Sequence, residues 1–418
     1  MKRAVPDRDV AGGVTPERRD MTQGVPVAFP TARDSLFDPP AAMHSLCGNE
    51  ALTRVCFPDG RPGWLATAHS TARTVLADAR FTARADATHP AVPRAATLPE
   101  HPPARPGTPG ASTAPAHQRY RRLLAAQFTE HRMRRLAERA EEITGELLDA
   151  MERAGSPADL MEHYALPLPA LLLCELLGVP EGERERFRQD AAVWSGSGTS
   201  AEDLTGAGAS LTACLHRLVR LRRAHPADDL LSGLIGADPA LTDDELAAVA
   251  FLLLPAGHET TAHQLGLGIL ALLDRPGRLT ALGTGRRRTD RAVEELLRYV
   301  SVVDHGPTRA AREDVQIGGT TVRAGEVVVV SLAAANRDPR RFPAPDLLDL
   351  TRDTTGHLAF GHGAHQCLGG PLARIALDAG LTALLDRFPG LRPAVPADQI
   401  PLRQDAPVHG VHRLPVAW

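Results

Sequence analysis

The chain has 418 residues, 43% of them hydrophobic, which is enough apolar side chain for a large buried core. Its 47 basic residues nearly balance 50 acidic ones, so a general attraction to nucleic acid or to an anionic membrane is not indicated. We find no apolar run long enough to span a bilayer and no apolar signal core, so we expect a cytoplasmic protein with a disordered tail over residues 1–27.

The N-terminal part of the chain mixes short apolar runs with turn residues. Apolar residues between Val55 and Ala66 are interrupted by Pro58-Asp59-Gly60, which predicts a β-hairpin in a small sheet. Residues 88–116 are rich in Pro, Ala, Thr and Gly. They predict a long irregular loop, and loops of this length are usually functional or disordered.

Helical periodicity dominates the middle of the chain. We expect helices near residues 116–128, 131–154, 158–178, 181–194 and 202–224. A capping box of Thr242 and Glu245 then starts a long helix that runs to about Asp274. Pro255 lies inside this helix, and we expect a kink there because proline removes one helix hydrogen bond.

The C-terminal third combines helices and strands. A helix is expected over 289–300, strands over 315–317 and 327–330, a proline-rich meander over 339–356, and a last long helix from about Cys367. The sequence therefore predicts a mainly α protein with a minor β part.

The segment from Phe360 to Gly369 carries the strongest functional signal. Its three glycines permit tight turns and a close approach of the backbone to a flat ligand. Helical periodicity begins directly after Cys367, and the free N–H groups of a helix N-terminus favour a thiolate. The segment resembles the haem-binding signature F-x-x-G-x-x-x-C-x-G of the cytochrome P-450 superfamily, matched by Phe360, Gly363, Cys367 and Gly369. The resemblance implies that Cys367 is the axial ligand of the haem iron.

A second motif lies midway along the long helix. Thr260 can bond back to the carbonyl of Ala256, and Gly257 removes a side chain where a ligand must pass closely. Taken alone, Glu259-Thr260 would be read as a surface-facing pair. The run Ala256–Thr260 resembles the [AG]-G-x-[DE]-T motif of the same family, which implies that Thr260 hydrogen-bonds dioxygen and that Glu259 relays protons.

Glu295 and Arg298 form an E-x-x-R pair on the predicted 289–300 helix, where residues three apart share a face. The pair resembles the structural Glu-x-x-Arg of the family. The resemblance implies that an arginine of the meander joins it; Arg352 is the first candidate and Arg337 the second.

Four basic side chains, His117, Arg121, Arg309 and His365, match family positions that bind the haem propionates. Charge-assisted hydrogen bonds from such donors hold carboxylates strongly. The residues that lead into His117 depart from the family pattern, but His117 and Arg121 are both present.

The resemblance covers residues 28–418 and implies one catalytic domain with the cytochrome P-450 fold. In that fold helices form a triangular prism with small sheets, and haem lies between the long central helix and the cysteine-ligand helix. The implied cofactors are haem b and the cosubstrate O2. The implied reaction inserts one oxygen atom into a small hydrophobic organic substrate by hydroxylation or epoxidation. Tailoring of a bacterial secondary metabolite such as a polyketide or macrolide is expected.

Two alternatives remain open: the same haem chemistry used for oxidative coupling or ring formation, and a non-catalytic member that binds a carrier protein. Electrons are expected from a ferredoxin and its reductase, because no flavin or iron–sulfur motif is found in the chain. We expect a monomer without nucleic-acid or membrane partners.

Positions carried over from the family suggest where substrate and ferredoxin bind. The pocket candidates are Val302, Val303, Val408 and His409, with the loops 85–115 and 195–201. The ferredoxin is expected to dock on an arginine cluster comprising Arg119, Arg122, Arg132, Arg134 and Arg135. The alternative for this cluster is an ordinary solvated helix face.

Overall fold

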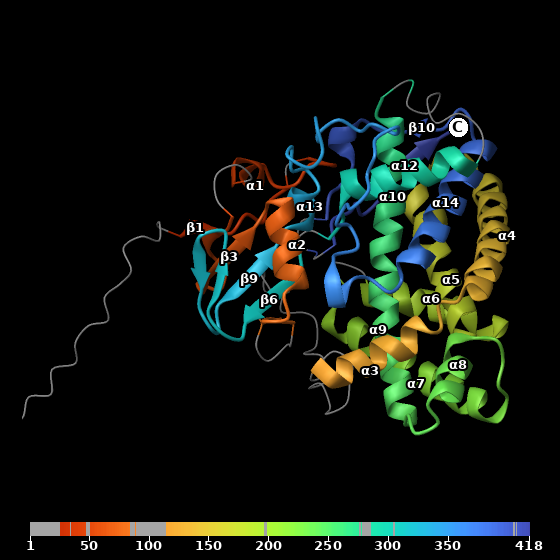
Figure 1. Ribbon diagram of the computed structural model, residues 1–418. Coiled ribbons are helices and arrows are strands. Elements are labelled where there is room, and N and C mark those ends of the chain that lie inside the picture. Colours follow the sequence, from red (N-terminus) through yellow and green to blue (C-terminus); the bar gives the residue numbers. More distant parts are fainter. Residues whose placement is uncertain are drawn as a thin grey trace, which may run out of the picture.

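The computed structural model describes residues 26–33, 35–46, 51–83, 88, 114–195, 199–275, 277, 286–303, 306–403, 406 and 408–418 (Figure 1). The predicted tail over residues 1–27 lies almost entirely outside this part of the chain, as does the predicted loop over 88–116. Those two predictions therefore stay predictions.

Helices form most of the molecule, as the periodicity predicted. In chain order they are α1 (Ala41–Leu46), α2 (His69–Ala77), α3 (Ala114–Ala125), α4 (Glu130–Ala154), α5 (Pro167–Leu177), α6 (Glu181–Ser195), α7 (Ala201–Ala224), α8 (Leu230–Ala237), α9 (Asp243–Gly257), α10 (Glu259–Leu273), α12 (Arg286–Val300), α13 (Leu332–Ala335) and α14 (Gly370–Arg387). A π-helical turn over Met161–Ala165 precedes α5. Among the described helices, none is long and apolar enough to span a bilayer.

The strands gather mainly at one side of the molecule (Figure 1). A six-stranded sheet has the order β1-β2-β3-β9-β6-β4, and smaller sheets have the orders β10-β11-β5 and β7-β8. The strands are β1 (Val27–Ala28), β2 (Thr53–Cys56), β3 (Pro62–Ala66), β4 (Phe81–Thr82), β5 (Ala158–Asp159), β6 (Thr308–Ala311), β7 (Val315–Ile317), β8 (Thr320–Val322), β9 (Val327–Val330), β10 (Arg392–Pro393) and β11 (Pro415–Ala417).

The predicted hairpin is confirmed as the antiparallel pair β2–β3. Strand β3 also pairs in parallel with β9, and Trp64 lies opposite Val328.

The predicted long helix is present as two consecutive helices, α9 and α10. The capping box of Thr242 and Glu245 starts α9, as predicted. The helix continues through Pro255 and is interrupted only at His258, three residues after the expected kink. The hydrogen bonds from His258 N to Leu254 O, 2.9 Å, and from Ala262 N to His258 O, 3.0 Å, span the interruption.

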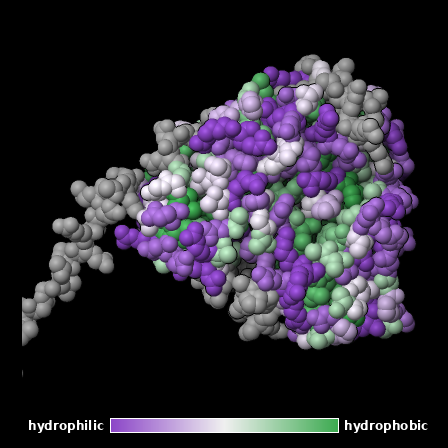
Figure 2. Space-filling model, viewed as in Figure 1, coloured by the Kyte–Doolittle hydropathy of each residue, from purple (hydrophilic) through white to green (hydrophobic). Residues whose placement is uncertain are grey.

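Two apolar clusters lie around this central helix. One contains residues of α4, α10, α12 and α14, and the other contains residues of α5, α7, α8 and α9. Hydrophilic side chains dominate the face in Figure 2, and hydrophobic ones form patches between them. The central helix is therefore packed on several sides, which fixes it relative to α14 and to the segment before α14.

Candidate active site

A cavity of about 550 Å³ lies between the central helix and the segment that leads into α14. Of the predicted site residues, those that line it are His117, Arg121, Ala256, Gly257, Thr260, Val302, Val303, Phe360, His365, Cys367 and Gly369. Apolar side chains of α5 line it as well: Pro169, Leu172, Leu173 and Leu176. These α5 residues were not predicted as site residues, although the sequence shows the apolar run that contains them.

The segment before α14 forms a tight loop around Cys367. Its backbone N–H donates to Phe360 O over 2.9 Å. Gly363 has φ +75°, and a Cβ there would lie 2.7 Å from the carbonyl oxygen of Leu76 in α2. Only glycine meets both conditions without moving the backbone, so the loop is held against α2.

Burial raises the pKa of the Cys367 thiol, while the backbone N–H groups of Gly369 and Gly370 and the charges of Arg121 and Arg374 oppose this rise. Cys367 lines the cavity and is exposed to it. The predicted amide donors are therefore present, but burial outweighs them. A bound metal cation would supply the stabilisation that a thiolate still needs here.

The four predicted propionate ligands come together beside the cavity. The rings of His117 and His365 lie 4.1 Å apart between centroids. Arg121 Nη1 donates to Gln366 O over 2.8 Å, and Arg309 Nη1 donates to Thr308 O over 2.9 Å. Burial, with the charges of Arg309, His117 and Arg121, lowers the pKa of His365 to about 4.

This cluster fits an anionic ligand. Burial lowers the pKa of Arg309, whose side chain is only 6% exposed. In the part of the chain that the structure describes, no acidic side chain forms an ion pair with any of the four residues. A buried cation without a counter-charge is costly, so two carboxylates of a bound group would be stabilised here. The residues therefore fit a haem with its iron at Cys367.

The two residues of the predicted acid–alcohol pair face different surroundings. Thr260 lines the cavity, and its hydroxyl donates to Ala256 O over 2.5 Å. Glu259 is buried and is not among the lining residues; its Oε1 lies 2.7 Å from Arg403 Nη2. Arg403 was not predicted, because nothing in its local sequence marks it.

The four predicted pocket residues divide in a similar way. Val302 and Val303 line the cavity, whereas Val408 and His409 lie behind them. Val408 forms an antiparallel bridge with Val303, and His409 N donates to Val302 O over 2.7 Å. The ring of His409 contacts Leu36 O at 2.9 Å. Most of loop 85–115 and residues 196–198 lie outside the described residues.

Glu295, Arg298 and Arg352 meet in one buried group. Arg298 Nε lies 2.7 Å from Glu295 Oε2, and Arg352 Nε lies 3.2 Å from Glu295 Oε1. Arg298 also donates to the carbonyls of Asn336 and Pro345. The second candidate, Arg337, pairs instead with Asp38 and Asp346. The group ties α12 to the meander that leads into the cysteine loop.

The arginine cluster proposed for docking is largely paired within the molecule. Arg119 pairs with Asp238, Arg134 with Glu130, and Arg135 with Asp228. Arg132 is buried and bonds to Gln127, Asp228 and Asp229. Arg122 is exposed and contacts only the carbonyl of Gln118 within the described residues. Arg122 is therefore the member best able to meet a partner.

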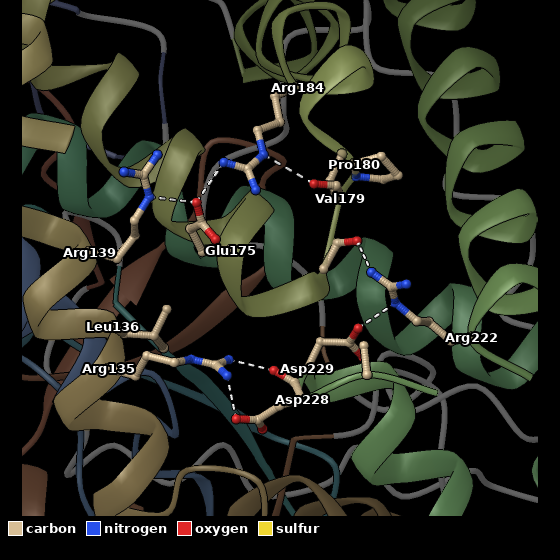
Figure 3. A pocket seen from close by; sticks show the side chains of 12 residues that line it. Arg135, Leu136, Arg139, Glu175, Val179, Pro180, Arg184, Arg222, Asp228 and Asp229 are labelled. Carbon is tan, nitrogen blue, oxygen red and sulfur yellow. Dashed lines mark hydrogen bonds and ion pairs between the residues drawn. The ribbon is translucent and has the colours of Figure 1, made fainter. Parts of the chain in front are cut away.

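A second cavity, of about 410 Å³, is separate from this site and is lined mainly by charged residues of α4 to α7 and of the turn before α8 (Figure 3). Glu175 accepts hydrogen bonds from Arg139 and Arg184, and Arg222 pairs with Asp229. Arg135 pairs with Asp228, so each charged side chain that lines this cavity has a partner of opposite charge in it. The cavity therefore joins helices and does not present a free ionic group.

Comparison with known proteins agrees with this geometry. The family model described as Cytochrome P450 matches residues 287–408. The chain is 59% identical to Cytochrome P450 105C1 of Streptomyces sp, over 95% of this chain and 100% of that protein. It is 44% identical to Nocardicin C N-oxygenase of Nocardia uniformis subsp. tsuyamanensis, over 89% and 94%. The crystal structure of CYP105P1 in complex with filipin I superposes with a TM-score of 0.85 at 37% identity, covering 94% of this chain and 99% of that one.

Proposed function

The chain belongs to the cytochrome P450 family, and from this premise we propose that it transfers one atom of O2 to a bacterial secondary metabolite by hydroxylation or epoxidation. It is a cytochrome P450 monooxygenase, and its family implies a haem iron, a small organic substrate and a redox partner. One observation carries the proposal: Cys367 and Thr260 line the same cavity, beside two arginines and two histidines, among them the buried Arg309, that have no acidic partner among the described residues.

The proposed cofactor is haem b. Cys367 would bind its iron, and His117, Arg121, Arg309 and His365 would bind its propionates, because these four donors converge without acidic partners in the described chain. Phe360 and Gly369 would border it, and Ala256 and Gly257 would leave room above it. A haem iron with a thiolate ligand supplies the chemistry of O–O bond cleavage.

The protein's own contribution is to orient substrate and to supply protons. Thr260 presents its hydroxyl to the cavity and can exchange the hydrogen bond to Ala256 O for one to a bound molecule. We assign proton supply to Glu259, the adjacent ionisable group. Apolar side chains of α5 with Val302 and Val303 would hold a hydrophobic substrate and exclude water.

The substrate class is proposed from the pocket and from relatives. One relative is named as an N-oxygenase of nocardicin C, and one solved relative binds filipin I. Because the wall of the pocket is apolar, we propose a hydrophobic metabolite such as a polyketide or macrolide. We further propose a single catalytic domain over 28–418 that acts as a monomer in the cytoplasm, with electrons from a ferredoxin and its reductase.

The proposal is tested first at Cys367. The reduced wild-type protein with carbon monoxide should show the absorption band typical of a thiolate ligand, and Cys367→Ser should lose this band because a hydroxyl does not replace the thiolate. Cys56→Ser, at a cysteine outside the cavity, is the control and should keep the band. If the Cys367→Ser protein retained the band, the assignment of Cys367 as the iron ligand would be wrong.

The wild-type protein then serves to identify the substrate. A spectral binding screen against the intermediates of the biosynthetic pathway encoded beside the gene should find a compound that perturbs the haem spectrum. Oxygen labelled from O2 should appear in its product. Coupling or ring closure without incorporated label would support the alternative outcome over hydroxylation or epoxidation.

A further inference from the structure

A buried ion pair joins Glu259 to a residue far along the chain. Arg403 Nη2 lies 2.7 Å from Glu259 Oε1, and only 5% and 12% of the two side chains is exposed. In such a shielded place a neighbouring guanidinium strongly favours the ionised form of a carboxyl group. The contact with Arg403 therefore favours the carboxylate form of Glu259, which accepts hydrogen bonds and has no proton to donate.

The position of this carboxylate also separates it from the cavity. Thr260 belongs to the wall of the cavity, but its neighbour Glu259 does not. The carboxylate instead contacts Arg403, which follows the bridge residue Leu402 near the C-terminus. To pass a proton toward Thr260, Glu259 must first take up a proton and loosen its contact with Arg403.

Arg403 also contacts two other described residues, Gly410 and His263. Its backbone N–H donates to Gly410 O over 3.0 Å, within the bridge that pairs Leu402 with Val411. Its Nη1 lies 2.5 Å from Nε2 of His263, one helical turn after Glu259. Because a guanidinium can only donate, Nε2 accepts, and the neutral ring carries its proton on Nδ1.

The surroundings of His263 keep its ring able to accept this hydrogen bond from Arg403. It is 4% exposed, and burial followed by the charge of Arg403 lowers its pKa well below the ordinary range, so it stays neutral and able to accept. Its Nδ1 faces Gly410, where a Cβ would collide with the ring. A glycine at position 410 is therefore needed for His263 to meet Arg403.

Among the described residues, histidines are the titratable groups that act on this pair and on His263. His258 directly precedes Glu259, and burial lowers the pKa of its ring to about 4. The charges of His409 and His412 act on His263 from the C-terminal segment. With His258 and His263 neutral at pH 7, Arg403 is the cation that the described residues place against Glu259.

We propose that Arg403 is a positioning residue that holds Glu259 as a carboxylate outside the cavity wall and so governs when Glu259 donates a proton. The inference rests on the proposed role of Glu259 in proton supply. Arg403 is not among the residues that line the cavity, and the acidic residue it pairs with is Glu259.

The test uses infrared difference spectroscopy of the holoenzyme across pH, with Glu259→Gln to identify the band of Glu259. In wild type this band should be that of a carboxylate at pH 7. In Arg403→Gln the protonated band should appear at a pH about 1–3 units higher than in wild type, because the stabilising charge is gone. Arg403→Lys should restore most of the wild-type titration, and the pH profile of product formed per reductant consumed should shift in the same order.

Arg222→Gln is the matched control. It removes a guanidinium that pairs with buried Asp229 in the second cavity (Figure 3), so it should leave the Glu259 band unchanged. The same titration in wild type and Arg403→Gln would overturn the proposal. If Arg403→Gln does not fold, a protonated Glu259 at pH 7 in wild type would overturn it equally. Unchanged product per reductant in Glu259→Gln would instead reject the proton-supply role and leave the infrared result standing.

Discussion

At Thr260 the functional assignment depends on one hydroxyl group. Thr260→Ala removes a donor that faces the cavity, but it leaves the helix intact because alanine is a strong helix former. We expect reductant consumption to continue, hydrogen peroxide to accumulate and product to fall. Groups that transfer protons typically contribute about 10²–10⁴-fold, so the loss should be large. The measurement is product and peroxide formed per reductant consumed.

The control is Thr205→Ala on α7. Its hydroxyl also bonds back to the carbonyl four residues earlier, Ala201 O at 2.7 Å, but it lies outside the cavity. This variant should keep the wild-type ratio of product to reductant. If Thr260→Ala kept that ratio as well, the assigned role of Thr260 would be wrong.

Residues within one motif could be predicted from sequence because the motif itself places them together. The segment Phe360–Gly369 and the run Ala256–Thr260 both lie at the cavity, although Glu259 faces away from it. Arg403 could not be predicted, since its contact with Glu259 depends on the path of the C-terminal segment. The raised pKa of the Cys367 thiol could not be predicted from sequence either, because burial of the thiol depends on packing from several elements.

At the scale of elements, the buried group of Glu295, Arg298 and Arg352 fixes α12 to the meander. Glu295→Gln removes the charge that pairs with both arginines and leaves them buried. Breaking a buried pair in this way costs about 3–5 kcal/mol. We expect a marked fall in the free energy of unfolding and a lower haem content, measured by denaturant titration and by absorbance.

Glu130→Gln provides the comparison, because it breaks an exposed pair with Arg134 on α4. Exposed pairs are worth about 0–1 kcal/mol, so its stability should stay close to wild type. Equal stability of the two variants would show that the buried group does not hold α12 in place.

Helix prediction succeeded where periodicity was long and failed where it was short. The expected helix over 131–154 is Glu130–Ala154, and that over 202–224 is Ala201–Ala224. The eight-residue α8 was not predicted, because it is too short to show a clear period. The region 158–178 contains a short strand and a π-helical turn before α5, which begins at Pro167 as proline permits.

At the scale of the whole molecule, docking of an electron donor depends on surface charge. Arg122→Glu should slow reduction by ferredoxin at low salt. It reverses the charge of the one residue in the arginine cluster that has no acidic partner among the described residues. The difference from wild type should shrink as ionic strength rises and charges are screened. Stopped-flow reduction at several salt concentrations measures this effect, and substrate affinity should not change.

Arg132 is unsuitable for this experiment because it is buried, and a glutamate there would destabilise the fold. The control is Arg186→Glu on α6, which does not line the cavity that contains Cys367. It makes the same change of charge and should be reduced at the wild-type rate. Arg122→Glu behaving like this control at low salt would place the docking face elsewhere.

The overall architecture could be predicted because the motifs identified the family, and the mainly α fold with small sheets is confirmed. Pairing between distant strands could not be predicted from local patterns. Strand β3 shows the reason: its apolar run fits a strand, but nothing in it identifies β9 as its parallel partner.

The pairing of β3 with β9 also determines how long β3 lacks a partner strand during translation. Trp64 leaves the ribosome long before Val328, its partner, because 328 − 64 = 264 residues separate them. At about 5–20 residues per second, the gap is roughly 13–53 s. During this interval β3, four of whose five residues are buried in the finished protein, has only the strands before it as partners. The nascent chain therefore carries an unpaired apolar edge through most of its translation, and chaperones that bind such edges should be needed most during that window.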